Sequence, residues 1–261
     1  MSDAKEHLKR IRDQFTRQAE AYARMRQATD ESAFERLVTF ARARSEDRVL
    51  DVACGPAFLT MVFAAHCAEA VGFDATDKFL LLAQEEARRR DLGNVTFRHG
   101  DAEKLPFGDE EFDLVICRAV FHHLLHPAYV LSEMKRVAKP GGRILVVDML
   151  TSEEPAQAAY HNRIERLCDP SHTRALPKSE LMLLFSDLDI EIVDVAESVI
   201  DYRSVEEWMD HGGPPHDAAQ EILKLMDESI VVDRCGLNVR REAGKLRFTH
   251  RLGAFLGRVP S

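Results

Sequence analysis

Two carboxylates stand beside short apolar runs in the first third of the chain. Asp51 lies inside the run 49–53, and Asp74 closes the run 70–73, 23 positions later. A carboxylate in an apolar strand is costly unless donors surround it, so Asp51 is predicted either to order nearby loop amides or to contact a ligand amino group. Asp74 is placed to accept hydrogen bonds from both hydroxyls of a ribose. The alternative for Asp74 is a cap on the helix that begins near Asp77.

The turn Cys54-Gly55-Pro56 follows the first of these runs and has the composition of a ligand-binding loop. Gly55 has no Cβ, so a ligand can approach the backbone, and Pro56 suits the first position of a helix. A dinucleotide site needs three spaced glycines, and a nucleoside triphosphate site needs a Lys followed by Ser or Thr. The turn has neither pattern. It therefore suits a ligand with an amino-acid end better than one with a phosphate end.

A group of histidines raises the question of a metal. His122 and His126 could share one helix face, which is a spacing that metal sites use. However, no Glu or Cys is suitably interleaved with them, and Pro127 follows at once. We therefore expect no metal, and a capping or solvent-facing role for these two histidines.

His123 and His172 are the candidates for acid–base chemistry. Histidine titrates near neutral pH, so either side chain could accept a proton from a substrate or orient it. His172 lies in the polar loop 169–174, which either closes over a substrate or is an ordinary surface loop.

Hydrophobic periodicity predicts the elements that position these residues. Strands are predicted at 49–53, 70–73, 95–98, 112–117, 143–149 and 189–201, followed by a hairpin of 237–241 and 245–259. Helices are predicted at 3–28, 30–44, 56–63, 77–91, 127–138, 153–168, 178–186, 204–211 and 217–234. Their alternation is typical of an α/β protein with a parallel sheet. The alternating strand 189–201 suits a sheet edge, and the last strand is expected to enter the sheet antiparallel.

Composition limits the classes of function. The chain has 261 residues, 45% of them hydrophobic, and its net charge is −9, from 35 Lys and Arg against 44 Asp and Glu. This sign disfavours a nucleic-acid partner. No apolar run is long enough to span a membrane, and the first ten residues are too polar for a secretory signal. The five cysteines form no close pairs. We therefore expect a cytoplasmic protein without disulfides.

The order of these motifs resembles the class I S-adenosylmethionine-dependent methyltransferases. The subgroup it resembles contains the quinone-biosynthesis C-methyltransferases, and the match covers about residues 15–149. The resemblance implies a Rossmann-like, seven-stranded, mostly parallel sheet with an antiparallel last strand, N-terminal helices and a helical lid insertion. The expected division is 1–45 as an N-terminal helical lid segment, 46–150 as the cofactor-binding core, and 151–261 as acceptor-lid helices and C-terminal strands of the same sheet.

The resemblance also implies S-adenosylmethionine as the cofactor and suggests its contacts. Asp101, which by itself would be a turn former, would bind the adenine amino group, and the amide of Ala102 a ring nitrogen. Cys117 and Arg118 would line the methionine end, and Tyr22 would close over the pocket as a lid residue. The remaining expected cofactor contacts are Asp51, Ala53, Gly55, Asp74 and Ala75. Most members of the family carry a second glycine where this chain has Pro56-Ala57-Phe58.

The predicted function is methyl transfer to a small-molecule acceptor by direct displacement. The sulfonium already activates the methyl group, so the protein mainly aligns the attacking atom, roughly 3 Å away, and excludes water. Tyr160, Phe185, Trp208 and Met209 are either the lining of an aromatic or hydrophobic acceptor site or ordinary core residues. Carbon, oxygen and nitrogen acceptors all use this scaffold. Two alternatives stay open: a cofactor-binding regulator without turnover, and a nicotinamide oxidoreductase, which the missing glycines disfavour.

Overall fold

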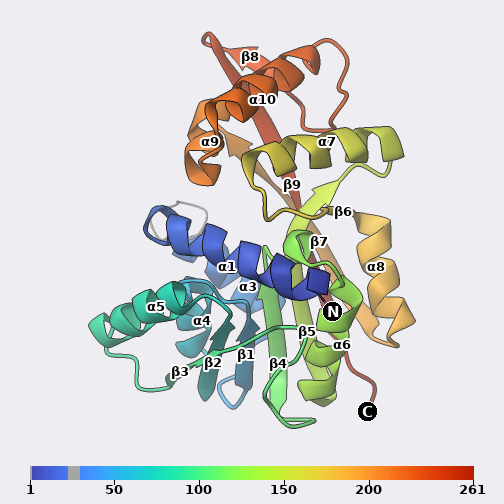
Figure 1. Cartoon of the computed structure of the whole chain (residues 1–261). Helices are drawn as coiled ribbons and strands as arrows, with labels where there is room; N and C mark the ends of the chain where they lie inside the picture. The colour runs from blue at the N-terminus through green and yellow to red at the C-terminus, as the bar shows by residue number, and fades with distance from the viewer. Residues whose placement is uncertain (1, 23–29) are drawn as a thin grey trace.

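A mixed β-sheet forms the centre of the computed structural model, which describes residues 2–22 and 30–261 (Figure 1). Seven of its strands lie in the order β3-β2-β1-β4-β5-β9-β7. Strands β1 to β5 are parallel, and β9 runs antiparallel between β5 and β7. The bounds are Arg48–Val52 (β1), Glu69–Asp74 (β2), Val95–His99 (β3), Phe112–Arg118 (β4), Ala138–Thr151 (β5), Glu191–Tyr202 (β7) and Lys245–Arg258 (β9). The predicted fold class is confirmed, including the antiparallel last strand and the edge position of β7.

Two short strands bring the sheet to nine strands within the described residues. Leu176–Pro177 (β6) pairs with β5 and was not predicted. Arg240–Glu242 (β8) pairs with the start of β9, so the predicted hairpin exists, but its first strand begins later than expected. Residues 139–142 form a bulge in β5: Phe112 pairs with Ala138 and Leu114 with Arg143, so these four residues have no partners on β4.

Helices cover both faces of the sheet, because successive residues of a buried strand point to opposite sides. Leu50 and Val52 of β1 pack in one cluster with α6 (Pro127–Val137) and α8 (Lys178–Asp187). Val49 packs on the other face with α3 (Glu31–Phe40) and α4 (Phe58–Ala64), and α5 (Asp77–Arg89) packs beside α4. Asp30 is the N-cap of helix α3, and the helix ends earlier than predicted, before Arg42, which has a left-handed φ of 55°.

A second layer stands above the carboxyl ends of the parallel strands (Figure 1). It consists of α7 (Pro155–Cys168), α9 (Val205–Gly212), α10 (His216–Glu228), β8 and the first part of β9. The three helices and β9 share an apolar cluster that includes Val205 and Phe248. Residues 251–258 of β9 pair with β5 in the main sheet, whereas 245–247 pair with β8. Strand β9 thus connects the two layers.

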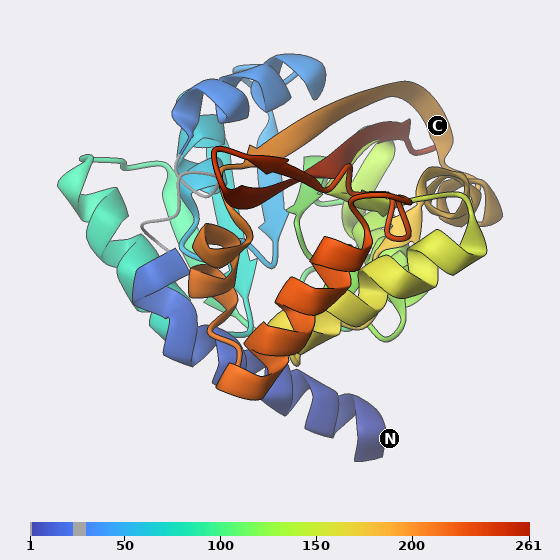
Figure 2. The same cartoon turned by 90° about the horizontal axis from the view of Figure 1, so that it is seen from above.

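Helix α1 (Ser2–Tyr22) crosses the molecule between these layers (Figures 1 and 2). The amides of Gln14 and Gln18 donate hydrogen bonds to the carbonyl of Gly212 at 3.3 and 2.7 Å, which ties α1 to the end of α9. The last part of the predicted helix 3–28 lies outside the described residues. None of the helices in the described ranges combines the length and the apolar composition that a membrane span requires.

Candidate functional site

The loop after β1 is a tight turn at the point where the strand order reverses. Strand β1 lies between β2 and β4, and in open α/β sheets ligands bind at such a switch point, beyond the carboxyl ends of the strands. Three residues of the turn have left-handed φ angles: Ala53 at 56°, Gly55 at 56° and Ala57 at 60°. The last of these is the N-cap of α4. The turn therefore exposes its backbone to the space above β1.

Asp74 links this turn to the end of β2. Its Oδ2 accepts a hydrogen bond from the amide of Gly55 at 2.8 Å, and its Oδ1 accepts one from the amide of Thr76 at 2.7 Å. Burial raises the pKa of Asp74, although these two amides oppose the shift. The side chain does not cap α5, whose N-cap residue is Thr76. Asp74 thus fixes the turn and leaves lone pairs on both oxygens for hydroxyl donors.

Asp51 lies beneath the same turn. Its Oδ2 accepts a hydrogen bond from the hydroxyl of Thr60 at 2.6 Å, and burial raises its pKa from 3.8 to about 7. The Thr60 bond and the charge of Arg118 favour the ionised form, while Asp74 opposes it. The hydrogen-bond partner of Asp51 is thus the hydroxyl of Thr60 and not the loop amides. Asp51 is a buried acid that a nearby cationic group would ionise.

Asp101 follows β3 and forms a turn. Its Oδ1 accepts a hydrogen bond from the amide of Glu103 at 3.0 Å, and its carbonyl accepts one from the amide of Lys104. Gly100 precedes it, and a Cβ at this position would lie 2.7 Å from the ring of Phe73. The turn-forming role that the local sequence suggested therefore exists, and it places Asp101 at the same cavity as the two acids above.

One cavity brings most of the predicted cofactor residues together. Its lining includes Asp51, Ala53, Gly55, Asp74, Ala75, Asp101, Ala102 and Arg118. Leu8, Ile11 and Phe15 of α1 form part of its wall, so the N-terminal helix covers the cavity. We call it the first cavity.

Two of the expected cofactor residues are not placed at this cavity. Cys117 is 1% exposed and packs in the core cluster on the α6 face, because neighbouring residues of β4 point to opposite sides and Arg118 takes the cavity side. Tyr22 ends α1, but its side chain lies outside the described residues.

A second cavity adjoins the first. Both are lined by Phe15, Arg118, Ala119 and His123, so these residues stand at their junction. The second cavity lies beneath α7 and α9, and its aromatic walls are Tyr202 and Trp208. Its polar residues include His122, Asp148, Glu165, Asp169, His172 and His250. Of the four apolar residues proposed to contact an acceptor, only Trp208 lines it; Phe185 belongs to the main core.

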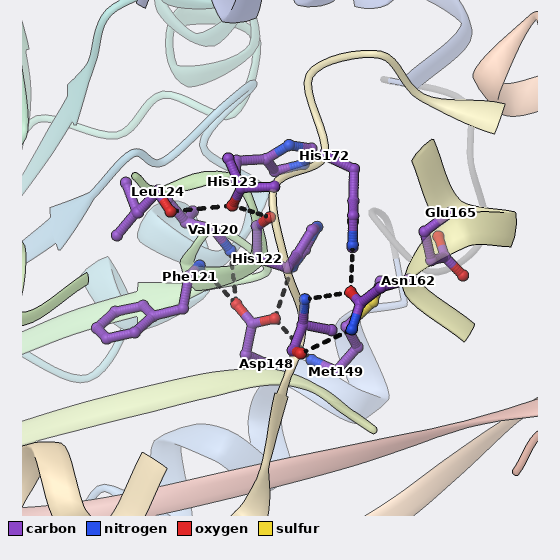
Figure 3. A network of polar contacts seen from close by, with 12 residues as sticks. Val120, Phe121, His122, His123, Leu124, Asp148, Met149, Asn162, Glu165 and His172 are labelled. Atoms are coloured by element: carbon purple, nitrogen blue, oxygen red, sulfur yellow. Dashed lines mark hydrogen bonds and ion pairs between the residues drawn. The ribbon is translucent and has the colours of Figure 1, made fainter. Parts of the chain in front are cut away.

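Asp148, which the sequence analysis did not single out, organises the segment after β4 (Figure 3). Its Oδ2 accepts hydrogen bonds from the amides of Val120 and Phe121 at 2.8 and 2.7 Å, and its Oδ1 accepts from the amide of Met149 at 2.8 Å. The Nδ1 of His122 lies 2.6 Å from the same Oδ1. Burial works against both charges, but each holds the other ionised: the pKa of Asp148 is lowered and that of His122 is raised.

His123 stands at the junction of the two cavities in a defined tautomer. Its Nδ1 lies 3.1 Å from the hydroxyl of Ser171, and that hydroxyl donates its hydrogen to Asp169 at 2.6 Å. A hydroxyl has a single hydrogen, so the Nδ1 of His123 donates to Ser171 and its Nε2 carries the lone pair. Burial and the neighbouring His122 lower the pKa of His123 to about 4. The imidazole is therefore neutral at neutral pH.

His172 lies deeper in the second cavity. Its Nε2 donates to Oδ1 of Asn162 at 2.8 Å, and burial lowers its pKa to about 2 (Figure 3). The loop that carries it is attached to the segment after β4: the amide and the hydroxyl of Thr173 both donate to the carbonyl of His122. The loop is thus part of the cavity wall and is no free surface loop.

A His–Glu–His group, also missed by the sequence analysis, completes the polar wall. Glu165 lies between His161 and His250, with its Oε1 at 3.2 and 2.8 Å from their Nε2 atoms. Burial would raise the pKa of Glu165, but the two imidazoles hold it well below its usual value. Burial lowers the pKa of His161. His161 and Glu165 share a helix spacing, but His250 is 85 positions later in the chain and no local signal connects it to them.

The strand order, the antiparallel β9 and the cavities at the carboxyl ends of the strands define a Rossmann-like methyltransferase fold of class I. A family model described as "Methyltransferase domain" matches residues 43–226. The chain belongs to this methyltransferase family, and the resemblance noted in the sequence is confirmed.

Named relatives agree with this assignment. The uncharacterised methyltransferase YcgJ of Bacillus subtilis (strain 168) is 32% identical over 217 residues, which span 82% of this chain and 85% of that protein. Its crystal structure matches with a TM-score of 0.80 at 29% identity, covering 88% of this chain and 99% of that one. The ubiquinone/menaquinone biosynthesis C-methyltransferase UbiE of Ectopseudomonas mendocina (strain ymp) is 37% identical over 123 residues, 46% of this chain and 48% of that protein. The chain spans about half of the length of that last relative.

Proposed function

We propose that the protein transfers the methyl group of S-adenosylmethionine to a small-molecule acceptor held in the second cavity. The observation that carries this proposal is the convergence of Asp51, Asp74 and Asp101 on the first cavity, which shares part of its lining with the second. Three acids from different strand ends match the three polar parts of an adenosyl amino acid. Membership of the methyltransferase family supports the same chemistry.

Each acid takes one part of the cofactor. Asp74, already oriented by two backbone amides, accepts hydrogen bonds from the ribose hydroxyls. Asp51 pairs with the cofactor's ammonium group, and Asp101 with Ala102 receives the adenine edge. The methionine end then lies toward Arg118 and Ala119, which line both cavities. This orientation points the sulfonium methyl group at the second cavity. Two structures of Haemonchus contortus phosphoethanolamine N-methyltransferase 2, in complex with S-adenosylhomocysteine and with S-adenosyl-L-methionine, share the fold.

The second cavity favours an aromatic acceptor that carries a polar group. Tyr202 and Trp208 offer flat apolar walls, while His123, His172 and Glu165 offer buried hydrogen-bonding atoms. A purely hydrophobic acceptor would offer no hydrogen to the free Nε2 of His123, and a buried acceptor left unpaired costs roughly 1–3 kcal/mol. His123, with its Nε2 unprotonated at the junction, is the group that receives a proton if the acceptor must lose one. His172 is the second candidate for that role.

Binding experiments test the cofactor site without knowledge of the acceptor. We expect S-adenosylhomocysteine to bind at one site per chain in a calorimetric titration and NADH not to bind. Asp74→Ala should weaken the affinity roughly 10- to 150-fold, because hydrogen bonds to a charged group contribute about 1.5–3 kcal/mol. Asp77→Ala is the matched control, because Asp77 lies three positions later and its side chain is 70% exposed. Equal affinities for the two variants, or tighter binding of NADH, would contradict the proposal.

Turnover distinguishes an enzyme from a cofactor-binding regulator. Incubation with a methyl-labelled donor and a set of hydroxy-, amino- and carbon-nucleophile aromatic acceptors should transfer label to at least one class. A protein that binds S-adenosylhomocysteine and methylates none of them would favour the regulator. A ligand that copurifies in the second cavity would identify the acceptor class directly.

A further inference from the structure

His161, Glu165 and His250 bring three metal-ligand atoms together at the wall of the second cavity. His161 and Glu165 are four residues apart on α7, so they share a helix face, and His250 faces them from β9. The three atoms lie within 4.8 Å of one another. The side chains belong to residues that are only 1%, 5% and 2% exposed. Two imidazoles and one carboxylate are thus gathered in the interior, where polar groups need partners.

The contact between Glu165 and His250 is short but lacks the geometry of a hydrogen bond. The Nε2 of His250 lies 2.8 Å from Oε1 of Glu165, yet it makes no hydrogen bond to any residue in the described part of the chain. The ring of His250 is therefore oriented so that an Nε2–H bond would not point at the carboxylate of Glu165. A buried nitrogen without a well-aligned hydrogen-bond partner destabilises the folded state. A cation between the carboxylate oxygen and the two nitrogens would pair with all three atoms at once.

The spacing fits a four-coordinate ion. Zinc binds imidazole nitrogen and carboxylate oxygen at about 2.0–2.2 Å, which places the ligand atoms of a tetrahedral site roughly 3.2–3.6 Å apart. The observed separations of 3.2 and 2.8 Å from Oε1 of Glu165 lie within a few tenths of an ångström of that range. Two histidines and one glutamate are a ligand set that zinc uses where a fourth position stays open.

The open position would face the second cavity. Glu165 and His250 are among the residues that line this cavity, whereas His161 is not. The aromatic rings of Tyr202 and Trp208 border His250, with ring centroids 5.1 and 6.1 Å away. A molecule lying against these rings would therefore reach the fourth position of a metal bound here.

We propose that His161, Glu165 and His250 form a site for a divalent transition-metal ion, best matched by Zn²⁺, whose remaining position binds an oxygen of the acceptor. The acceptor contact rests on the proposed function, whereas the metal site does not. The expectation of no metal came from His122 and His126, which belong to a different part of the fold. His122 lies in the 3₁₀ turn Phe121–His123, where Asp148 engages its Nδ1.

Metal titration of the whole chain tests the site. After removal of adventitious metal with a chelator, Zn²⁺ alone should bind at one ion per chain, and Co²⁺ alone should give the intense visible bands of a four-coordinate ion. Cys168 also lines the second cavity, so the near-ultraviolet region is recorded as well. Absence of a thiolate-to-cobalt band there assigns the ligands to imidazole and carboxylate. Failure of the wild-type protein to bind either ion, or a thiolate band, would overturn the proposal.

Variants locate the ligands. His250→Gln, His161→Gln and Glu165→Gln should each weaken Zn²⁺ binding by at least about 100-fold, since even an outer-shell partner of a metal is worth 10- to 100-fold. His172→Gln is the matched control, because it removes another buried histidine of the same cavity and should leave the Zn²⁺ affinity within about twofold of the wild type. Circular dichroism identifies any variant that fails to fold. Equal effects in all four variants would reject these residues as ligands.

The metal site and the proposed function fail in distinguishable ways. S-adenosylhomocysteine binding, measured on the metal-free chain, tests the first cavity alone. Loss of that binding with intact Zn²⁺ binding would contradict the methyltransferase assignment and leave the metal site standing. Intact S-adenosylhomocysteine binding without any metal binding would contradict the metal site and leave the methyltransferase assignment standing.

Discussion

The Nδ1 of His122 and the Oδ1 of Asp148 lie 2.6 Å apart in the floor of the second cavity, and both residues are buried. The same carboxylate holds the amides of Val120 and Phe121. One side chain at the end of β5 therefore fixes the backbone that carries His123 to the junction of the two cavities (Figure 3).

Replacement of Asp148 should strongly destabilise the fold. Asp148→Ala leaves a buried imidazole and several backbone donors without an acceptor, and breaking a buried pair in this way costs about 3–5 kcal/mol in the free energy of unfolding. Urea denaturation, monitored by circular dichroism, measures the loss. Asp109→Ala is the control, because Asp109 also forms an ion pair, with Arg136, but its side chain is 74% exposed, so its effect should stay below about 1 kcal/mol. Similar losses in both variants would contradict the anchoring role.

Cofactor affinity should increase with pH through the titration of Asp51. Its pKa of about 7 in the free protein means that binding an ammonium group requires the loss of a proton from the carboxyl group. We expect S-adenosylhomocysteine to bind up to roughly tenfold more tightly per pH unit between about pH 5.5 and 7, with a plateau above. Calorimetry in buffers of different ionisation enthalpy also measures the released proton. Asp51→Asn should bind more weakly at pH 7.5 and show no such slope; an unchanged slope would place the titrating group elsewhere.

The raised pKa of Asp51 should affect stability in the opposite direction: the free energy of unfolding should fall as the pH rises. Asp51 holds a proton in the folded state, up to a pKa of about 7, that the unfolded chain releases near 3.8. The free energy of unfolding therefore falls as pH rises through this interval, because the folded state binds more protons there. Asp51→Asn removes this dependence, so the difference in unfolding free energy between variant and wild type should grow in the variant's favour from pH 4 to pH 7. A constant difference, measured by urea denaturation without ligand, would contradict the raised pKa.

Ser171 should act as a positioning residue for His123. Ser171→Ala removes the acceptor of the Nδ1 hydrogen, so the ring can turn and lose the tautomer that presents Nε2. With an acceptor found by the labelling screen, we expect kcat to fall by about 10- to 100-fold, compared with 100-fold or more for His123→Ala. The affinity for S-adenosylhomocysteine should stay the same, which a general loss of structure would not allow. Unchanged turnover of both variants from about pH 6 to 9 would remove His123 from the mechanism.

Much of the cofactor cavity could be predicted because its residues follow strand ends in the first half of the chain. Asp51 and Asp74 stand out locally as acids beside apolar runs, and their strands pair directly in a parallel sheet. Asp148 carries the same signal, an acid in the apolar run of β5, and could have been found by the same argument. Its role was missed because the fifth strand was treated as structural only.

The second cavity could not be assembled from local patterns. Glu165 and His250 belong to α7 and β9, and only the placement of β9 between β5 and β7 brings them together. The side chain of Cys117 was assigned to the cofactor by family position, but strand alternation turns it into the core. Periodicity predicts which residues are buried; it does not predict which distant elements share a cavity.

The departure from the family's second glycine places an alanine, Ala57, in a left-handed backbone conformation. Ala57 adopts the left-handed φ of 60° that glycine would take without strain, at a cost of roughly 1–2 kcal/mol. Its methyl group is fully buried against Met61, Ala83 and Ala87, which stabilises the folded state by about 0.8 kcal/mol. Alanine also restricts the unfolded chain, which stabilises the folded state by about a further 0.4–1 kcal/mol relative to glycine. These contributions nearly cancel. Ala57→Gly should therefore change the free energy of unfolding by less than about 1 kcal/mol.

The matched control for this substitution lies in the same cluster. Ala83 is equally buried, at 0% exposed, but sits inside α5 with regular helical geometry. Ala83→Gly loses the same methyl contacts and adds the helix cost of glycine, about 1 kcal/mol, so it should destabilise by roughly 2 kcal/mol. Urea denaturation of the two variants measures the difference, which isolates the strain stored at Ala57. Equal losses would show that the turn holds alanine without strain, and that the missing glycine has no effect on the geometry of the cofactor loop.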